Sequence, residues 1–295
     1  MKALWQVSFR PIGKSKINDF YQNLFVDSIK SINFDITFSL TQFDEQNVET
    51  FIKEKNIKNN YINFPQHQLP KGKKYSNKIM LDNALSQFIE GNDYQYFIYS
   101  TADIIVPNNL FSILEGIKNE NFCAFVYPNT HVKNNKIENT FWPHYGIDLI
   151  IFKISKEKAI YFKEIIESYN QYDWGINENF YIASSEALKL QKFNLFKSCN
   201  VLKFDNDFQA FTEDRSWQIE SWKENKTYFM NFLNKNKLSK FYANGSYYYL
   251  LYKIFNLRDL NLNLLLSYLI FYPFNIIKKL FNIIRKIYIY KKDIK

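Results

Sequence analysis

The sequence of 295 residues contains few of the residues on which several common classes of protein depend. Its seven glycines form neither the G-x-G-x-x-G turn of dinucleotide-binding proteins nor the phosphate loop of P-loop NTPases. Its three histidines include no H-E-x-x-H segment, and no serine stands in a G-x-S-x-G segment. The sequence therefore argues against a dinucleotide oxidoreductase, a P-loop NTPase, a zinc hydrolase and an α/β-hydrolase.

Cysteine is also scarce. The two cysteines, Cys123 and Cys199, lie far apart in the sequence and indicate neither a disulfide framework nor a cysteine metal site. The first ten residues are too mixed in polarity for the apolar segment of a signal peptide. Both observations favour a reducing, cytoplasmic location.

Acidic residues are outnumbered by basic ones, and most of the basic excess lies at one end of the chain. The net charge is +9, and residues 278–295 alone contain seven cations and one acid. Because the rest of the chain is close to balanced, we expect no nucleic-acid partner. In residues 274–289 apolar and basic side chains fall on opposite faces of a helix, which predicts a helix lying in a membrane surface. The alternative is a helix packed on the protein with its cations facing water.

Apolar and aromatic residues are abundant, at 46% and 19% of the sequence, which is enough for one sizeable core. Short apolar segments alternate with helical patterns, which predicts an α/β fold with a largely parallel central sheet flanked by helices. We expect one catalytic domain at residues 1–240 and a helical tail at 241–295, the membrane-surface anchor. The predicted strands are 4–9, 35–40, 61–64, 96–99, 122–127 and 149–152. The predicted helices are 17–29, 44–55, 76–90, 109–118, 155–169, 178–190 and 217–236, and residues 128–140 are expected to form a loop without regular structure.

The most informative segment is residues 94–107. A buried strand ends in Ser-Thr-Ala-Asp at Asp103, and three apolar residues, a proline and an asparagine-led helix start follow. A carboxylate at the carboxyl end of a buried strand lies where open α/β sheets bind ligands. The alternative is that Asp103 only caps a helix or begins a turn.

This segment resembles the Asp-X-Asp segment of GT-A glycosyltransferases, and most of all that of family-2-like bacterial sugar transferases. Thr101 stands where the first aspartate of that pattern would be. The resemblance implies a GT-A fold, a nucleotide-sugar donor and a divalent cation, Mn²⁺ or Mg²⁺, held by Asp103. It also implies that Arg10, Lys78, Thr101 and Asp103 bind the donor. As alternatives, Arg10 and Lys78 are solvated surface cations.

A second group of candidates follows at residues 141–148. The aromatic and imidazole side chains of Trp142, His144 and Tyr145 suit sugar binding, and the resemblance places them on the acceptor side. Asp148 directly precedes the predicted strand at 149–152 and is a candidate catalytic carboxylate. The alternative is that the aromatic residues belong to the core and that Asp148 caps a turn.

The resemblance to inverting family-2-like enzymes places the general base near a later helix start, where Asp173 and Glu178 lie, and the match is by order in the chain only. Asp205 and Asp207 form a further acidic cluster that suits a late metal ligand or, more simply, a surface turn.

Together these features predict a glycosyltransferase that moves a sugar from a nucleotide-sugar donor to a cell-surface glycan or lipid-linked acceptor. We expect it at the inner face of the cell membrane, attached as a peripheral protein. One alternative is a catalytically silent, membrane-associated scaffold with a transferase fold, which Thr101 favours. Another is a nucleotidyltransferase, although the glycine-rich amino-terminal loop of those enzymes is missing.

Overall fold

The structure is a computed structural model of the chain. It describes residues 2–91, 93–126, 130–133, 136–139, 147–169, 171–172, 177–195, 198–204, 216–239 and 242. By its internal contacts the chain divides into two units, Met1–Tyr248 and Tyr249–Lys295, and every described residue belongs to the first. The predicted amphipathic tail therefore lies outside the described residues and stays a prediction. Within the described ranges, no helix is both long enough and apolar enough to cross a membrane.

A seven-stranded sheet forms the centre of the first unit, in the order β10-β6-β9-β4-β1-β2-β3. All its neighbouring strands run parallel except β9, which runs antiparallel to both β4 and β6. This arrangement confirms the prediction of an α/β fold with a largely parallel central sheet. The strands are β1 (Lys2–Val7), β2 (Asp35–Gln42), β3 (Asn59–Asn63), β4 (Tyr94–Ser100), β6 (Phe122–Val126), β9 (Leu149–Lys153) and β10 (Gln191–Asn194).

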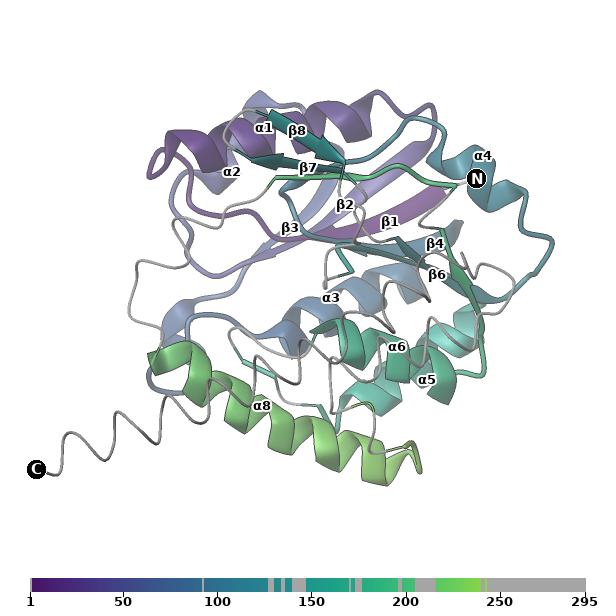
Figure 1. The fold of residues 1–295 in the computed structure, drawn as a ribbon. Coiled ribbons are helices and arrows are strands. Elements are labelled where there is room, and N and C mark those ends of the chain that lie inside the picture. Colours follow the sequence, from purple (N-terminus) through teal and green to yellow (C-terminus); the bar gives the residue numbers. More distant parts are fainter. Residues whose placement is uncertain are drawn as a thin grey trace, which may run out of the picture. The chain divides into compact units, whose positions relative to one another are not determined.

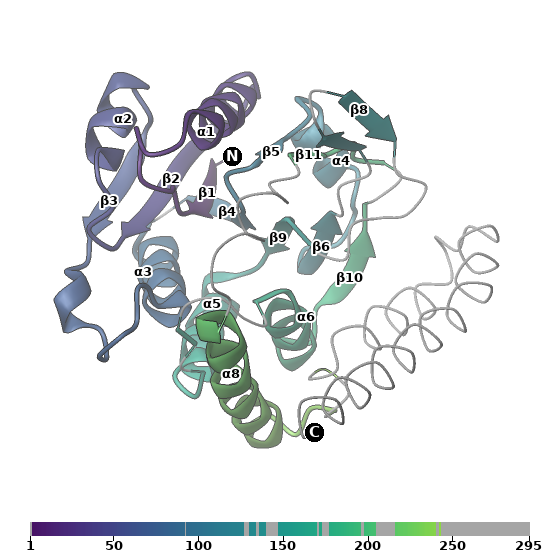
Figure 2. The ribbon, with the colours of Figure 1, turned by 60° about the vertical axis from the view of Figure 1, so that its left-hand side comes forward.

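Helices cover both faces of this sheet (Figure 1). On one face lie α1 (Lys16–Lys30), α2 (Val48–Glu54) and α4 (Leu110–Glu115). On the other lie α3 (Asn77–Glu90), α5 (Lys156–Ile166) and α6 (Asn177–Ala187), and α8 (Ser216–Lys235) packs beside them (Figure 2). A short 3₁₀ turn, η1 (Gln66–Gln68), precedes α3.

Three of these helices begin where a serine supplies the cap. The hydroxyl oxygens of Ser15, Ser76 and Ser155 accept hydrogen bonds from the backbone N–H groups three residues later, at the starts of α1, α3 and α5. Each satisfies an amide that has no partner within its own helix. The predicted starts of the helices at 76 and 155 are confirmed.

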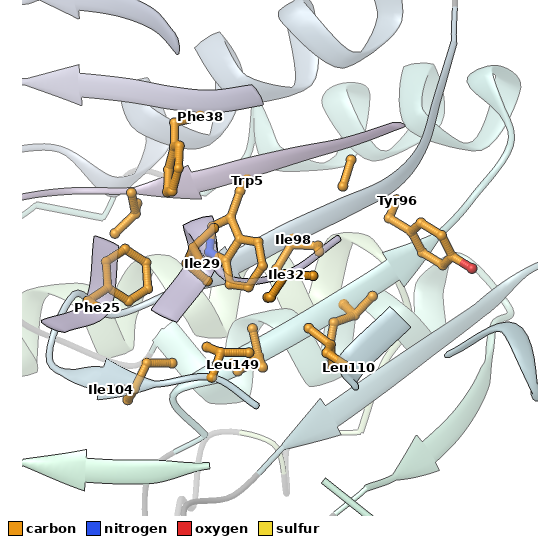
Figure 3. Close-up of a cluster of buried hydrophobic side chains, with 14 of the residues drawn as sticks. Trp5, Phe25, Ile29, Ile32, Phe38, Tyr96, Ile98, Ile104, Leu110 and Leu149 are labelled. Atoms are coloured by element: carbon orange, nitrogen blue, oxygen red, sulfur yellow. The ribbon is translucent and has the colours of Figure 1, made fainter. Parts of the chain in front are cut away.

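One large group of buried apolar side chains lies between the sheet and helices α1, α2 and α4 (Figure 3). Trp5 is completely buried, and its ring contacts those of Phe25 and Phe38, with centroids 6.3 Å and 6.4 Å away. The indole N–H of Trp5 donates to the hydroxyl oxygen of Ser100 at 2.8 Å, which links β1 to the last residue of β4. This bond fixes the strand end that precedes Asp103.

A second, smaller sheet has the order β5-β11-β7-β8. Its strands are β5 (Ile104–Ile105), β11 (Leu202–Phe204), β7 (Thr130–Lys133) and β8 (Lys136–Asn139). The expectation of a loop without regular structure at 128–140 was therefore wrong, because β7 and β8 pair there as an antiparallel hairpin. The strands β7 and β8 have only four residues each. Their positions depend on backbone pairing, which the pattern of apolar residues in the sequence does not reveal.

The helix expected at 44–55 begins later than predicted, at Val48. Asp44 and Asn47 adopt left-handed backbone conformations, with φ of 59° and 60°. The carboxylate of Asp44 accepts hydrogen bonds from the backbone N–H of Gln66 and the side chain of Asn63. These bonds hold residues 44–47 in a turn, and Asp and Asn tolerate that conformation better than most residues.

The bond between Trp5 and Ser100 gives a stability prediction. We expect Ser100→Ala to lower the free energy of unfolding by about 1–3 kcal/mol, because it leaves the buried indole N–H without an acceptor. Ser39→Ala on β2 is the matched control, since Ser39 is equally buried but its hydroxyl has no hydrogen-bond partner among the described residues. We expect that variant to be neutral or slightly more stable. Urea unfolding of both variants measures the difference, and equal effects would contradict the importance of the bond.

Candidate functional site

Two strand ends meet at the carboxyl edge of β4. The antiparallel pairing of β4 with β9 sets Ser100 opposite Leu149. One residue further on, the backbone N–H of Thr101 donates to the carbonyl oxygen of Asp148 at 3.1 Å. Thr101 and Asp148 therefore face each other just beyond the paired strands.

The small sheet brings a third segment to the same place. Lys203 of β11 pairs with Ile104 of β5, and the N–H of Phe204 donates to the carbonyl oxygen of Asp103 at 3.0 Å. The ring of Phe204 stacks on that of Tyr21 in α1, with centroids 4.1 Å apart. These contacts position Lys203 beside Asp103, although 100 residues separate the two in the sequence.

The ammonium group of Lys203 lies between two carboxylates. Its nitrogen is 2.7 Å from Oδ1 of Asp103 and 2.6 Å from Oδ1 of Asp148. It also lies 3.4 Å from the hydroxyl of Thr101, which itself bonds Oδ1 of Asp148 at 3.3 Å. The three charged side chains are 11%, 19% and 8% exposed for Lys203, Asp103 and Asp148. We call these four residues the Lys203 cluster.

Burial and charge act in opposite directions in this cluster. Burial lowers the pKa of Lys203, but the charges and hydrogen bonds of Asp148 and Asp103 outweigh it and raise the pKa above its ordinary value. For Asp103, burial raises the pKa, yet the charge and hydrogen bond of Lys203, with smaller contributions from Thr101 and Arg10, hold it below the ordinary value. Lys203 is therefore protonated and Asp103 ionised at neutral pH.

Arg10 belongs to the same site through its charge. It lies in the loop between β1 and α1, exposed to solvent, and near enough to lower the pKa of Asp103. The loop is anchored on α1, because the backbone N–H of Arg10 donates to Gln22 at 2.5 Å and that of Gly13 to Asp19 at 3.0 Å. Gly13 has a φ of +86°, a conformation that glycine adopts without strain.

The other predicted cations lie in different surroundings. Lys78 in the first turn of α3 donates to the carbonyl oxygen of Glu167 at 3.4 Å. Across the described ranges, no hydrogen bond or ion pair joins Lys78 to the Lys203 cluster. The structure thus brings together Arg10, Thr101, Asp103 and Asp148 from the predicted site, and it places Lys78 elsewhere.

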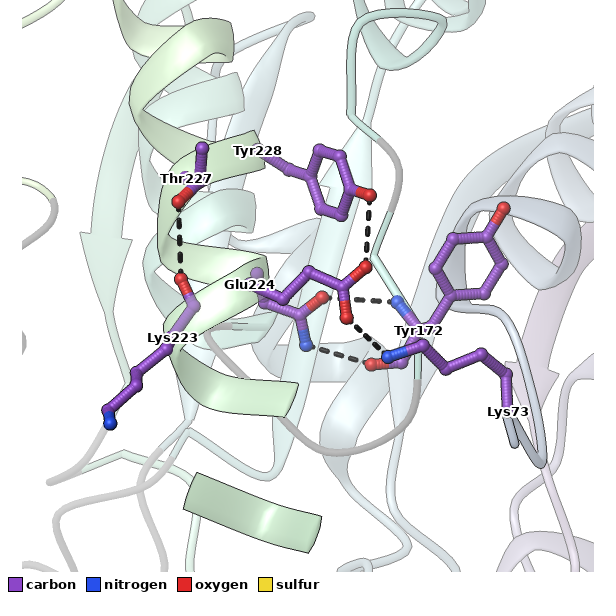
Figure 4. Close-up of polar contacts among 7 residues, drawn as sticks. Lys73, Tyr172, Lys223, Glu224, Thr227 and Tyr228 are labelled. Atoms are coloured by element: carbon purple, nitrogen blue, oxygen red, sulfur yellow. Dashed lines mark hydrogen bonds and ion pairs between the residues drawn. The ribbon is translucent and has the colours of Figure 1, made fainter. Parts of the chain in front are cut away.

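Lys73, five residues before Lys78, contributes to packing (Figure 4). It forms an ion pair with Glu224 of α8, and its ammonium lies 6.0 Å from the ring centre of Tyr172. The side chain of Asn225 donates to the carbonyl of Tyr172 at 2.8 Å and accepts from its N–H at 3.2 Å. These bonds fasten residues 73 and 172 to α8.

Several predicted residues cannot be placed in this site. Trp142, His144, Tyr145 and Asp173 lie outside the described residues, as do Asp205 and Asp207. Glu178 belongs to α6, but its side chain is outside the described part of the chain. Their assigned roles stay predictions.

Sequence reasoning missed Lys203. The signal that could have identified it is a charged residue in the short apolar run Val-Leu-Lys-Phe at 201–204. A lysine inside a short strand rarely becomes buried unless it is paired.

The Lys203 cluster does not fit a divalent cation in its present form. Mg²⁺ and Mn²⁺ need several oxygen ligands close to one point. Among the described residues no group of three or more His, Cys, Asp or Glu side chains is placed to hold a metal ion. The oxygens of Asp103 and Asp148 that converge here already bind an ammonium group. The prediction of a metal at Asp103 stays a prediction, and this geometry argues against it.

Comparisons with known proteins bear on the fold. No protein-family model and no curated protein matches the sequence. The chain is similar to S. aureus TarS, in the structure of its residues 1–349 in complex with UDP-GlcNAc, with a TM-score of 0.51 and 8% identity over 82% of this chain and 69% of that chain. This likeness confirms the GT-A-like glycosyltransferase fold that residues 94–107 implied, and at this identity it shows the fold alone.

Two further solved structures are similar at lower TM-scores. The inositol-1-phosphate CTP transferase from T. maritima has a TM-score of 0.41 and 10% identity over 76% of this chain and 96% of that chain. A Drosophila galactosyltransferase 7 mutant in complex with manganese, UDP-Gal and xylobiose has a TM-score of 0.37 and 12% identity over 75% and 79%. Because both scores lie below 0.5, neither likeness supports an inference about this chain.

The Lys203 cluster gives a second stability prediction. We expect Lys203→Met to lower the free energy of unfolding by about 3–5 kcal/mol at neutral pH, because it leaves two buried carboxylates without their cation. Lys192→Met on β10 is the control, since Lys192 pairs with the half-exposed Glu186 and such pairs contribute less than about 1 kcal/mol.

The free energy of unfolding that Lys203→Met loses should depend on pH in a direction that the pKa shifts define. The lowered pKa of Asp103 gives the wild type stability that is present above about pH 4, the ordinary carboxyl pKa, and lost as pH falls through the folded value. The raised pKa of Lys203 gives stability that is present below about pH 10 and lost as pH rises through the folded value. Denaturant unfolding between about pH 3 and pH 9 checks the acidic part of this dependence. A difference between wild type and Lys203→Met that does not shrink below about pH 4 would contradict the charge pairing.

Proposed function

We propose that this chain is a glycosyltransferase that takes a sugar from a nucleotide-sugar donor and transfers it to a cell-surface glycan or lipid-linked acceptor. The observation that carries the proposal is the position of the Lys203 cluster. It lies at the carboxyl end of β4, the central strand of a GT-A-like sheet, beside the loop that contains Arg10. Ligands of open α/β sheets bind outside the carboxyl ends of the strands.

The chemistry of the site suits a diphosphate leaving group. Glycosyl transfer leaves negative charge on the nucleoside diphosphate, and cations that are already in position stabilise it. Lys203 and Arg10 provide two cations at one sheet edge. A guanidinium group can also bind two phosphate oxygens at once. TarS, which shares the fold, has a structure in complex with UDP-GlcNAc. That complex makes a nucleotide sugar the first donor class to test here.

The acceptor hydroxyl must lose its proton during the transfer. Asp148, Asp173 and Glu178 are the candidate carboxylates for this step. Asp148 is held by Lys203 and Thr101, so Asp173 and Glu178 are the better bases by chemistry. The aromatic residues Trp142 and Tyr145, with His144, are proposed to bind the acceptor sugar.

The tail completes the proposal. A basic amphipathic helix at residues 274–289 would hold the enzyme at the inner face of the cell membrane, where lipid-linked acceptors are available. A catalytically silent scaffold is the second candidate, and the presence of Thr101 in place of an acid favours it. Measured donor binding and transfer separate the two.

Donor binding is the first test. We expect one member of a panel of UDP, GDP, CDP and ADP to raise the melting temperature by about 5–10 °C at a concentration one hundred times its Kd. Arg10→Gln should weaken that binding about 10- to 100-fold, because it removes a charge-assisted bond to phosphate. Lys14→Gln is the matched control in the same loop, since Lys14 is also an exposed cation.

The control should bind the nucleotide within about threefold of wild type, because its charge is screened by solvent. If no nucleotide stabilises the wild type, or if the two variants lose affinity equally, the donor site is not where we place it. Differential scanning fluorimetry and isothermal titration calorimetry provide both measurements.

Transfer is the second test. We expect Asp103→Asn to reduce nucleoside diphosphate release from the cognate nucleotide sugar by about 100-fold, because Lys203 loses one of the two groups that position it. Asp82→Asn serves as the control, since Asp82 forms a surface pair with Lys163 on α5. Turnover close to wild type in Asp103→Asn, with the protein folded, would make Asp103 a structural residue only.

A further inference from the structure

We propose that the ammonium group of Lys203 occupies the position of the divalent cation in metal-dependent enzymes of this fold, so that this site binds a nucleoside diphosphate without a metal ion. The proposal rests on the proposed function for the identity of the ligand. The position of Lys203 between Asp103 and Asp148 is independent of that function.

Geometry is the first argument. Asp103 is the carboxylate that the resemblance assigns to a metal, and one of its oxygens binds the nitrogen of Lys203 at 2.7 Å. Asp148, the neighbouring carboxylate across the strand ends, binds the same nitrogen at 2.6 Å. A metal ion could bind these two oxygens only if the ammonium group moved away. The backbone of Lys203 is fixed on a strand paired with β5, so the ammonium group could leave only by rotation of the side chain and loss of its bonds to both carboxylates.

Charge is the second argument. One divalent ion would neutralise the two carboxylates of Asp103 and Asp148. Lys203 and Arg10 together carry the same two positive charges at this edge of the sheet. The net charge at this edge of the sheet is therefore the same with two side-chain cations as with one divalent metal ion.

The threonine at position 101 is the third argument. In the acidic pattern that the segment resembles, an aspartate stands there and adds a further negative charge. Thr101 instead donates its hydroxyl to Asp148 at 3.3 Å and lies 3.4 Å from the ammonium nitrogen of Lys203. An ammonium group has half the charge of a divalent ion and needs fewer carboxylates around it. Relative to the acidic pattern, this site therefore has one carboxylate fewer at position 101 and an ammonium group, that of Lys203, in place of a divalent ion.

The ammonium group also retains a means to contact phosphate. It has three N–H donors, of which two make short bonds to carboxylates and the third makes the long contact to Thr101. A phosphate oxygen accepts such a bond better than a hydroxyl, because the bond is then between two charged groups. Lys203 is therefore proposed to bind the diphosphate directly, with Arg10 as its partner.

Metal binding tests the proposal without any nucleotide. Electron paramagnetic resonance measures the concentration of free Mn²⁺ in solution. We expect wild-type protein and Asp103→Asn to leave the same concentration of free Mn²⁺, because Asp103 does not bind the ion in wild type. Lys203→Ala should gain about one Mn²⁺ site per chain, because it frees two converging carboxylates. The double variant Lys203→Ala/Asp103→Asn should lose that site, and Lys192→Ala should behave as wild type. A wild-type Mn²⁺ site that Asp103→Asn abolishes would overturn the proposal, even if Lys203→Ala does not fold.

Nucleotide binding supplies the second readout. For the nucleoside diphosphate that binds wild type, we expect Kd in EDTA and in Mn²⁺ to agree within about threefold. Binding that is more than about tenfold tighter in Mn²⁺, with the gain lost in Asp103→Asn, would overturn the proposal while leaving the donor site intact. If no nucleotide binds under either condition, the proposed function fails. The Mn²⁺ measurements then still decide whether Lys203 holds the position of the cation.

Discussion

The pairing of one buried ammonium group with two carboxylates governs the chemistry available at this sheet edge. Each charge of the Lys203 cluster would be costly to bury alone, and together they form a hydrogen-bonded group. The lysine in turn depends on the small sheet, since β11 is held beside Asp103 by its pairing with β5, by the bond from the N–H of Phe204 to the carbonyl of Asp103 and by the stacking of Phe204 on Tyr21. The fold and the charge of the site are therefore linked in one structural unit.

The large sheet provides the fixed side of this unit. Trp5 bonds Ser100 at the end of β4, and the antiparallel strand β9 sets Asp148 opposite Thr101. Arg10 enters from the neighbouring strand β1, on a loop anchored to α1. Three segments that are distant in sequence meet at one edge, and each is held by hydrogen bonds to an adjacent element. A site built in this way has little freedom to rearrange around a different ion.

The sequence predicted the structure well in segments where a pattern of apolar residues continues over several turns of helix or along a whole strand. The alternation of apolar strands and helical periods predicted the layered α/β fold, and the helix starts predicted at residues 76 and 155 agree with the serine caps of the structure. Residues 94–107 led to Asp103 and to the GT-A fold, both of which can be inferred from adjacent residues. Asp148 was singled out as a candidate because it directly precedes an apolar strand, and the structure places it beside Lys203.

The sequence was uninformative where long-range pairing decides the structure. Lys203 meets Asp103 through strands of two and three residues, which are too short for a periodic signal. The β7–β8 hairpin was missed for the same reason. The departure of Thr101 from the acidic pattern could be seen in the sequence, but its contact with the ammonium group of Lys203, which lies 102 residues later, could not.

The most direct measurement of the central claim is a crystal structure of the wild-type protein grown with the nucleoside diphosphate that binds it and with MnCl₂, collected where manganese scatters anomalously. The account predicts the nitrogen of Lys203 within hydrogen-bond distance of Asp103, Asp148 and a phosphate oxygen, with no anomalous peak between the carboxylates. A manganese peak bound to Asp103, with the side chain of Lys203 turned away from both carboxylates, would contradict it.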